Sequence, residues 1–332
     1  MGLFRVLPAV TLAFAMLTGG NVLAAPQHNT VRIASPWPAQ NTIITMLGYG
    51  ENIVGTSAVA QKIPLFAASL PHIKNVPVIS VNSGHEIDPE QVIALNTQLL
   101  FVARNMAISR PELLARAGVR VVAFPANSMS ALRERVINTG EVLGPDASQK
   151  AQEYNAYFRD NQQRVARRLA GLAVQQRQRV YHSMGHPLRT SGRPSLNQDW
   201  MDLAGASNVA EGWFNGKKSA TGEVALENVV AANPQVIVAM NKRDADAILA
   251  SPQWAQTDAV LHHRVYVNPK GMFWWCRETS EEALQFLWLA KMLYPARFAD
   301  IDMHQETRHF YQRFFGLNLS DTQIETILNP PQ

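Results

Sequence analysis

The chain has 332 residues, of which 47% are hydrophobic and 17% are charged, and its formal net charge is +4. This composition suits a globular protein with two domains or lobes. Lysine and arginine are dispersed along the chain and follow no aromatic stripe, which argues against a nucleic-acid partner.

The N-terminal segment predicts a secretory signal peptide. Arg5 precedes an apolar run over residues 6–17, and the small residues Val22 and Ala24 fit cleavage after Ala24. The apolar run is too short to cross a bilayer, and no later segment approaches the ~20 apolar residues of a membrane span. An uncleaved amphipathic N-terminus is the alternative. We expect residues 1–24 to be removed and the mature protein to be exported, with the periplasm as its location.

Residues 25–145 alternate between short strand patterns and helix patterns. The strands are expected at residues 30–35, 52–57, 99–102 and 119–124, and the helices within 41–50, 89–96, 111–117 and 128–143. Helices that alternate with short Val/Leu/Ile runs indicate α/β units around a mainly parallel sheet. We expect this region to form an N-terminal α/β lobe.

Residues 146–173 break the alternation. They contain no proline and no glycine before Gly171, and one helical face is apolar while the other is charged. A helix of about 25 residues is roughly 37 Å long at 1.5 Å per residue. A coiled coil is disfavoured because no heptad persists. We predict one long helix that connects two lobes.

Residues 174–332 return to the α/β pattern and are expected to form a C-terminal lobe. One phrase recurs in both lobes: "DPEQVIALNTQLLFVA" at residues 88–103 and "ALENVVAANPQVIVAM" at residues 225–240. Each is a Glu-led helix, a turn and a buried strand. The repetition indicates a pseudo-twofold relation between the lobes.

In order and spacing, these phrases resemble the periplasmic substrate-binding proteins of ABC importers, cluster A or class III. The stretches that carry the likeness include "RIASPWPAQNTIITMLGYGENIVGTS", "GRPSLNQDWMDLAGASNVAE" and "LWLAKMLYPARF". The resemblance implies two three-layer α/β lobes joined by one long interdomain helix. It also implies a solute-binding role in the uptake of ferric siderophores, cobalamin or haem, rather than an enzyme.

Ligands of open α/β sheets bind beyond the carboxyl ends of the strands. Under this rule the residues that follow each predicted strand line the interlobe cleft. The candidate ligand-binding residues are Trp37, Ser83, His85, Arg104, Phe124, His182, His186, Lys242, Arg243, Trp274, Trp275 and Arg277.

Aromatic and cationic side chains dominate this set. Rings give rigid contact area at low entropic cost, and Arg and Lys donate charge-assisted hydrogen bonds to carboxylate or catecholate oxygens. Both features suit an anionic metal chelate with flat organic arms. Since adjacent residues face apart, we expect one of Trp274 and Trp275 to be buried. For Arg277, a structural cap or ion pair is an equal alternative.

Metal ligation by the protein has little support in the sequence. The lone Cys276 excludes an internal disulfide and any multi-cysteine zinc site. His182 and His186 are spaced four apart and are possible direct ligands, although "HSMGHP" is not helical. No resident cofactor is predicted, and the metal is expected to arrive as part of the ligand.

The resemblance also implies partners and further residues. Family members carry one exposed acidic residue on each lobe that pairs with the inner-membrane permease, and Glu90 and Glu227 match these positions. The helix dipole alone also favours a carboxylate in the first turn. The expected partners are a small-molecule metal chelate and an ABC permease with its ATPase, and the protein is expected to be a monomer.

The ligand remains open at this point. A ferric siderophore ranks first, and cobalamin, haem, a nickel or cobalt chelate, and molybdate or tungstate are alternatives. An exported α/β hydrolase is the alternative of a different class, although the sequence has no Gly-x-Ser-x-Gly elbow, phosphate loop or dinucleotide fingerprint. "RETSEE" at 277–282 reads as a helix start, with Thr279 or Ser280 as the N-cap.

Overall fold

The structure is a computed structural model that describes residues 30–81 and 86–331. The predicted signal peptide and two predicted ligand-binding residues, Ser83 and His85, lie outside these residues. Within the described ranges, no helix combines the length and the apolar composition that a bilayer crossing requires.

The N-terminal half contains a parallel four-stranded sheet in the order β2-β1-β5-β7. Its strands are β1 (Ile33–Ala34), β2 (Ile53–Gly55), β5 (Leu99–Ala103) and β7 (Arg120–Phe124). The helices of this half are α1 (Pro38–Met46), α2 (Ala58–Lys62), α3 (Pro64–Ser69), α4 (Pro89–Ala94), α5 (Pro111–Arg116) and α6 (Met129–Leu143). A small second sheet joins β3 (Ser80–Val81), β4 (Glu86–Ile87) and β6 (Ala107–Ile108).

Side-chain alternation along the strands produces three layers. Phe101 of β5 faces the apolar core that also contains residues of α1 and α6. Leu100 and Val102 of the same strand face a second cluster, formed with α4 and α5. Both faces of the sheet are therefore covered, as parallel sheets require.

The C-terminal half repeats this plan. Its parallel sheet has the order β10-β8-β12-β13, with strands β8 (Arg179–Ser183), β10 (Ser207–Asn208), β12 (Val236–Ala239) and β13 (Val265–Val267). A separate two-stranded sheet pairs β9 (Arg189–Ser191) antiparallel with β11 (Thr221–Glu223). The helices are α8 (Leu196–Leu203), α9 (Leu226–Ala232), α10 (Lys242–Ala250), α11 (Asp258–Leu261), α12 (Glu282–Leu293), α13 (Met303–Phe315) and α14 (Asp321–Leu328).

The predicted internal repeat is present in both topology and contacts. In each half the second, first, third and fourth strands of the main sheet lie in that order. The backbone N–H of Arg32 donates to the Gln98 side chain at 2.9 Å, and the N–H of Arg179 donates to the Gln235 side chain at 3.0 Å. The repeated phrase thus fixes the same strand junction twice.

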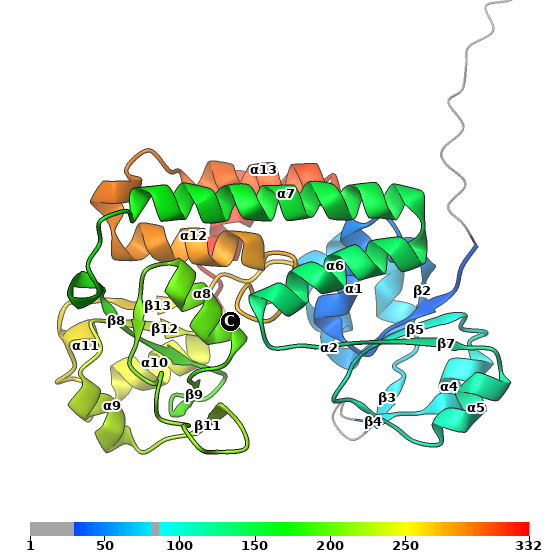
Figure 1. Cartoon of the computed structure of the whole chain (residues 1–332), viewed down its shortest axis with the longest axis horizontal. Helices are drawn as coiled ribbons and strands as arrows, with labels where there is room; N and C mark the ends of the chain where they lie inside the picture. The colour runs from blue at the N-terminus through cyan, green and yellow to red at the C-terminus, as the bar shows by residue number, and fades with distance from the viewer. Residues whose placement is uncertain (1–29, 82–85, 332) are drawn as a thin grey trace, which may run out of the picture. The chain divides into compact units, whose positions relative to one another are not determined.

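The predicted long helix is α7, which spans Pro145–Arg168, 24 residues. It begins at Pro145 in the first turn, a position that tolerates the missing N–H. In Figure 1 it lies along α12 and α13. Its residues Tyr154, Phe158 and Val165 are buried, as the apolar face predicts.

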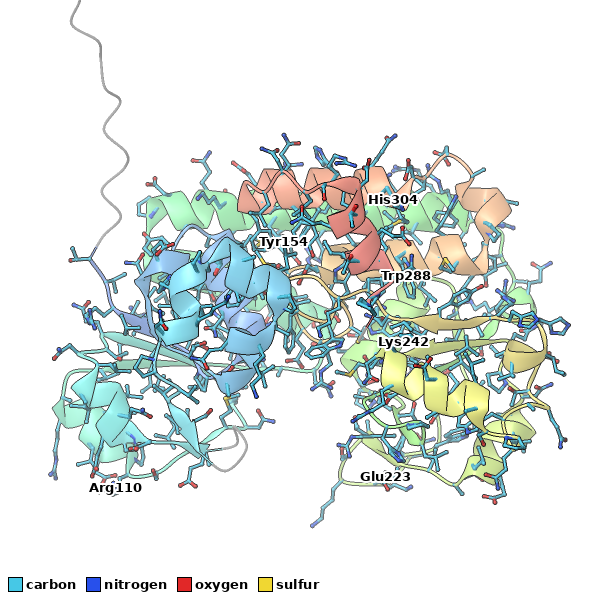
Figure 2. The ribbon with its side chains drawn as sticks, turned by 180° about the vertical axis from the view of Figure 1, so that it is seen from behind. Arg110, Tyr154, Glu223, Lys242, Trp288 and His304 are labelled. Carbon is cyan, nitrogen blue, oxygen red and sulfur yellow. The ribbon has the colours of Figure 1, made fainter. Side chains whose placement is uncertain are left out.

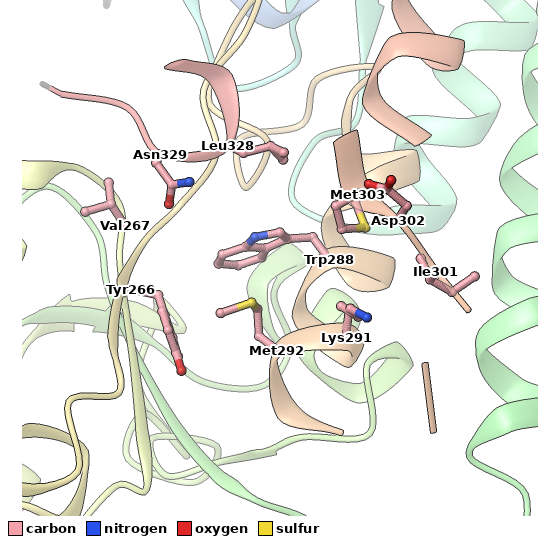
Figure 3. A pocket seen from close by; sticks show the side chains of 10 residues that line it. All are labelled: Tyr266, Val267, Trp288, Lys291, Met292, Ile301, Asp302, Met303, Leu328 and Asn329. Atoms are coloured by element: carbon pink, nitrogen blue, oxygen red, sulfur yellow. The ribbon is translucent and has the colours of Figure 1, made fainter. Parts of the chain in front are cut away.

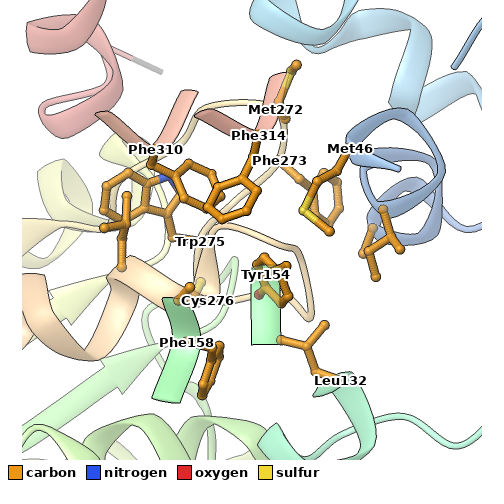
Figure 4. Close-up of a cluster of buried hydrophobic side chains, with 14 of the residues drawn as sticks. Met46, Leu132, Tyr154, Phe158, Met272, Phe273, Trp275, Cys276, Phe310 and Phe314 are labelled. Atoms are coloured by element: carbon orange, nitrogen blue, oxygen red, sulfur yellow. The ribbon is translucent and has the colours of Figure 1, made fainter. Parts of the chain in front are cut away.

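One apolar core extends through both halves. It contains residues of the N-terminal sheet, such as Phe101, and of the C-terminal sheet, such as Val238, together with residues of α7, α12 and α13. Figure 4 shows Tyr154 and Phe158 of α7 in this core with Trp275, Phe310 and Phe314. The Phe158 and Phe286 ring centroids are 5.3 Å apart.

Polar contacts reinforce this core where residues 278–282 meet the N-terminal half. Thr42 of α1 and Thr279 share a hydrogen bond of 3.0 Å, and the Tyr154 hydroxyl donates to the Ser280 carbonyl at 2.7 Å. Residues 279–282 are fully buried. The N-cap of α12 is Glu281, so the prediction that Thr279 or Ser280 is the N-cap is wrong. The Thr279 hydroxyl instead donates to the Glu281 carboxylate at 2.7 Å.

We expect Phe158→Ala to destabilise the whole body formed by residues 31–331, because it empties the core that both sheets share. Truncation of a buried Phe typically costs about 3–5 kcal/mol. Urea unfolding followed by far-UV circular dichroism should show one transition at a lower midpoint. Leu261→Ala, at a side chain that is 60% exposed, is the control and should change the unfolding free energy by less than about 0.5 kcal/mol. Two separate transitions in the wild type would contradict a shared core.

Candidate functional site

The loop at residues 268–277 is a compact turn that precedes α12. Lys270 and Trp274 form an isolated antiparallel bridge. The N–H of Gly271 donates to the Phe273 carbonyl at 2.9 Å, and the N–H of Trp275 donates to the Pro269 carbonyl at 3.1 Å. The aromatic residues therefore have fixed backbone positions.

Glu281 holds this loop from the interior. Its carboxylate accepts from the backbone N–H of Met272 at 2.6 Å and of Phe273 at 3.2 Å, and from the Tyr311 hydroxyl. Burial raises the pKa of Glu281 to about 7, although the same hydrogen bonds act to lower it. Gly271 is required here, because a Cβ at this position would overlap the Tyr311 hydroxyl.

The two adjacent tryptophans face apart, as expected. Trp275 is fully buried in the shared core. Trp274 is half-buried, and the Lys270 ammonium lies 4.4 Å from its ring centroid. Trp274 is therefore the aromatic residue of this loop that a ligand can reach, and Trp275 is a packing residue.

Trp274 lines a cavity of about 540 Å³ at the carboxyl end of β12. The lining residues are Asn241, Lys242, Arg243, Asp246, Trp274 and Pro331. Asn241 is the N-cap of α10, and its side chain accepts from the Asp244 N–H at 2.9 Å. This places Lys242 and Arg243 at the rim in the first turn of α10, and Figure 2 shows Lys242 at the surface of this helix.

The two cations of the cavity already have protein partners. The Lys242 ammonium lies 2.6 Å from a carboxylate oxygen of Asp246. The Arg243 guanidinium donates to the Gly185 carbonyl at 2.8 Å. Both side chains are exposed, so these contacts are screened by solvent.

His182 lies beneath this region, inside the C-terminal half. Its side chain is 1% exposed, and its ring meets Trp200 edge-on with centroids 5.2 Å apart. Its Nδ1 lies 2.9 Å from the Val238 carbonyl, which only accepts, so Nδ1 carries the proton. Burial and the nearby Arg277 lower the pKa of His182 to about 4. Among the described residues, Nε2 has no hydrogen-bond partner.

The other sequence-predicted residues are dispersed. Trp37 is 7% exposed, and the Arg135 guanidinium lies 3.8 Å from its ring centroid. Phe124 is buried and stacks on Phe101 at 6.0 Å. Both rings pack against other residues of the N-terminal half, and neither lines the cavity beside Trp274. Exposed positions are occupied by Arg104, His186 and Arg277.

The strand-end rule places Asn241 beside Lys242 and Arg243, as the structure has it, but sequence reasoning missed three contributors. Lys270 stands in the same aromatic stretch but was not selected, and Asp246 follows the selected cations. These two had a local signal in the sequence. Pro331 had none, because only the packing of the C-terminal segment brings it to the cavity.

A second cavity, of about 450 Å³, lies in the C-terminal half. Figure 3 shows Trp288 and Met292 of α12 facing Tyr266 of β13 across it, with Leu328 and Asn329 on another side. Its walls are mainly apolar. Lys291 donates to the Phe298 carbonyl at 2.8 Å, and Asp302 caps α13.

The two predicted docking carboxylates lie in the first turns of corresponding helices, α4 and α9. Both are exposed. Glu90 pairs with the Arg110 guanidinium at 2.9 Å. Across residues 30–81 and 86–331, no group of three or more His, Cys, Asp or Glu side chains is arranged to hold a metal ion.

Comparisons with known proteins agree on one family and fold. A family model described as "Periplasmic binding protein" matches residues 33–271. The molybdate-binding protein MolA of Haemophilus influenzae is 27% identical over 322 residues, covering 87% of this chain and 84% of that protein.

Solved structures give the same result for the fold. MolA bound to molybdate has a TM-score of 0.76 at 23% identity, covering 87% of this chain and 94% of that chain. A periplasmic solute binding protein from Veillonella parvula has a TM-score of 0.77 at 22% identity, covering 91% and 92%. CeuE of Helicobacter pylori with Ni(II) bound has a TM-score of 0.71 at 18% identity, covering 90% and 94%. The fold is therefore the class III fold expected from the sequence.

We expect the His182 imidazole to be neutral between pH 5 and 8, with the proton on Nδ1. Its pKa in the folded state lies below the unfolded value of about 6.5, so its contribution to stability is lost as the pH falls from about 6.5 to about 4. Nitrogen NMR of histidine-labelled protein, with His182→Gln for assignment, measures both the tautomer and the midpoint. A midpoint between 6 and 7 would contradict the buried, carbonyl-bound ring.

Proposed function

The chain belongs to the periplasmic binding protein family, and we propose that it captures an anionic metal compound for an ABC importer. In this proposal the exported protein is a monomer that carries the compound across the periplasm to an inner-membrane permease with its ATPase. The C-terminal wall of the binding site is formed by Trp274, Lys242 and Arg243. The relatives that match are named as binding proteins, which supports a role in transport rather than in catalysis.

The proposal rests on the excess of positive charge around the 540 Å³ cavity. Its lining holds two cations and one carboxylate, and Lys270 adds a further cation on the Trp274 ring. The start of α10 adds the positive end of a helix dipole. A bare divalent cation has no carboxylate, imidazole or thiolate cluster to bind within the described ranges. A metal surrounded by its own oxygen ligands suits these side chains better.

A ferric siderophore is our first candidate. The flat arms of such a chelate can stack on Trp274, and its carboxylate or catecholate oxygens can accept from Lys242 and Arg243. The cavity volume lies in the ordinary range for drug-sized ligands, about 300–1,000 Å³. A chelate of this size fills the cavity more completely than a tetrahedral oxyanion does.

Molybdate is the second candidate, because a molybdate-binding protein is similar over 87% of this chain. An oxyanion would accept hydrogen bonds from the cationic side chains and the amides at the start of α10, and it would not stack on the indole ring. Substitution of Trp274 therefore distinguishes the two candidates.

We expect a ferric siderophore to quench the tryptophan fluorescence of the purified protein. Trp274→Ala should weaken binding of the siderophore about 5- to 30-fold, since a stacked ring contributes roughly 1–2 kcal/mol when it is desolvated. Molybdate affinity should be lost in Lys242→Ala/Arg243→Ala but retained in Trp274→Ala if the oxyanion is the ligand. The compounds to be titrated are iron-loaded siderophores, iron-free siderophores, cobalamin, haemin, nickel-histidine and molybdate.

Lys218→Ala serves as the matched control, because this lysine is exposed and lies outside the cavity lining. Its affinities should equal those of the wild type. Absence of binding by every compound in the panel would refute the proposed class of ligand.

Glu90 and Glu227 are proposed to dock the protein on the two permease subunits. Charge reversal at both positions should abolish uptake in cells while the purified variant keeps its ligand affinity. Glu141→Arg, at an exposed position on α6, controls for a general effect of added positive charge. Normal uptake by the double variant Glu90→Arg/Glu227→Arg would contradict the docking assignment.

A further inference from the structure

The C-terminal segment, defined here as residues 328–331, contacts both cavities of the C-terminal half. Leu328 and Asn329 line the 450 Å³ cavity beside Trp288. Pro331 lines the 540 Å³ cavity beside Trp274. A single residue, Pro330, therefore lies between a residue that lines one cavity and a residue that lines the other.

This segment is held firmly by helix α14. Ile324 and Ile327 are 0% and 3% exposed. His304 of α13 lies 3.1 Å from the Glu325 carboxylate, and the Asn329 side chain donates to the same carboxylate group at 2.8 Å. Pro330 is buried, and its fixed φ stiffens the turn toward Pro331. The segment thus has a defined position.

Helix α14 is also coupled to the aromatic loop. The backbone N–H of Lys270 donates to the Ile327 carbonyl at 2.9 Å. Lys270 in turn pairs with Trp274 in the backbone bridge, and its ammonium covers the Trp274 ring at 4.4 Å. The same helix therefore positions two sides of the ligand cavity, namely Pro331 directly and Trp274 through Lys270.

We propose that the C-terminal segment is a specificity-determining partition between the two cavities, and that it limits the size of the ligand. This inference rests on the proposed function, because it takes the 540 Å³ cavity as the ligand site. Beyond the partition lies the mainly apolar cavity around Trp288, Met292 and Tyr266. A chelate with longer apolar arms would enter that second cavity only if the segment gave way. The partition therefore selects compact anionic metal compounds over extended ones.

The test uses two substitutions with opposite effects on the partition. Pro331→Gly removes ring atoms and rigidity, and Pro331→Trp adds bulk. The probes, in order of size, are molybdate, ferric citrate, a ferric trihydroxamate and a ferric tricatecholate. With Pro331→Gly we expect the tightest-binding probe of the wild type to lose at least 5-fold in affinity while the larger probes gain relative to it. With Pro331→Trp the larger probes should lose most. Affinities within twofold of the wild type for all four probes, in both variants, would overturn the proposal.

A ligand-free measurement separates failure of the partition from failure of the proposed function. In protein labelled with 5-fluorotryptophan, the fluorine resonances of Trp274 and Trp288 are assigned with Trp274→Phe and Trp288→Phe. Pro331→Gly should shift both resonances, and Thr322→Ala, on the exposed side of α14, should shift neither. If no probe binds the wild type, the assigned ligand class is wrong, and the fluorine spectra alone decide the partition. Unmoved resonances in Pro331→Gly would refute it.

Discussion

Phe158 of α7 packs on Phe286 of α12, and around this pair a single apolar core joins the two parallel sheets. Tyr154 adds a hydrogen bond to the Ser280 carbonyl, and Asn161 of α7 donates to the Ala283 carbonyl at 2.9 Å. Because these contacts bury groups from both halves, movement of one half against the other has to break packed interactions. Residues carried by the two halves are therefore held in a nearly fixed relation before any ligand arrives, and little conformational entropy remains to be lost on binding.

The aromatic loop depends on the same core. Trp275 is anchored in it, and Glu281, fully buried at the start of α12, accepts from the amides of Met272 and Phe273. This leaves Trp274 pointing the other way, toward Lys242 and Arg243 at the start of α10. A buried carboxylate is costly unless it is hydrogen-bonded. The loop amides that donate to Glu281 reduce this cost, and the same bonds hold the loop so that the Trp274 ring stays in one place. Rigid presentation of a ring and a few cations is the physical basis of the proposed recognition of an anionic metal compound.

Many elements of the fold could be predicted from local sequence patterns. The alternation of short apolar runs with helical patterns predicted the strands of the N-terminal main sheet and the 24-residue helix α7, because each depends on neighbours in sequence. The repeated phrase predicted a helix, a turn and a strand in each half, but not the contacts of Gln98 and Gln235 or the short strand β10. Helices α13 and α14 were not predicted. The residues that line the proposed site follow from the sequence only in part. Lys242, Arg243 and Trp274 follow from the rule of strand ends, whereas the covering of Trp37 by Arg135 and the arrival of Pro331 at the cavity are decided by tertiary packing. No pattern in neighbouring residues records such contacts.

We propose that an anionic metal compound binds at the cavity shared by Trp274, Lys242 and Arg243. Anomalous scattering from crystals grown with a ferric siderophore, collected at the iron edge, locates the metal without reference to any assumed pose. We predict one strong peak beside the Trp274 ring and the first turn of α10. A peak in the apolar cavity around Trp288, or a metal ligated mainly by protein carboxylates elsewhere in the molecule, would contradict it.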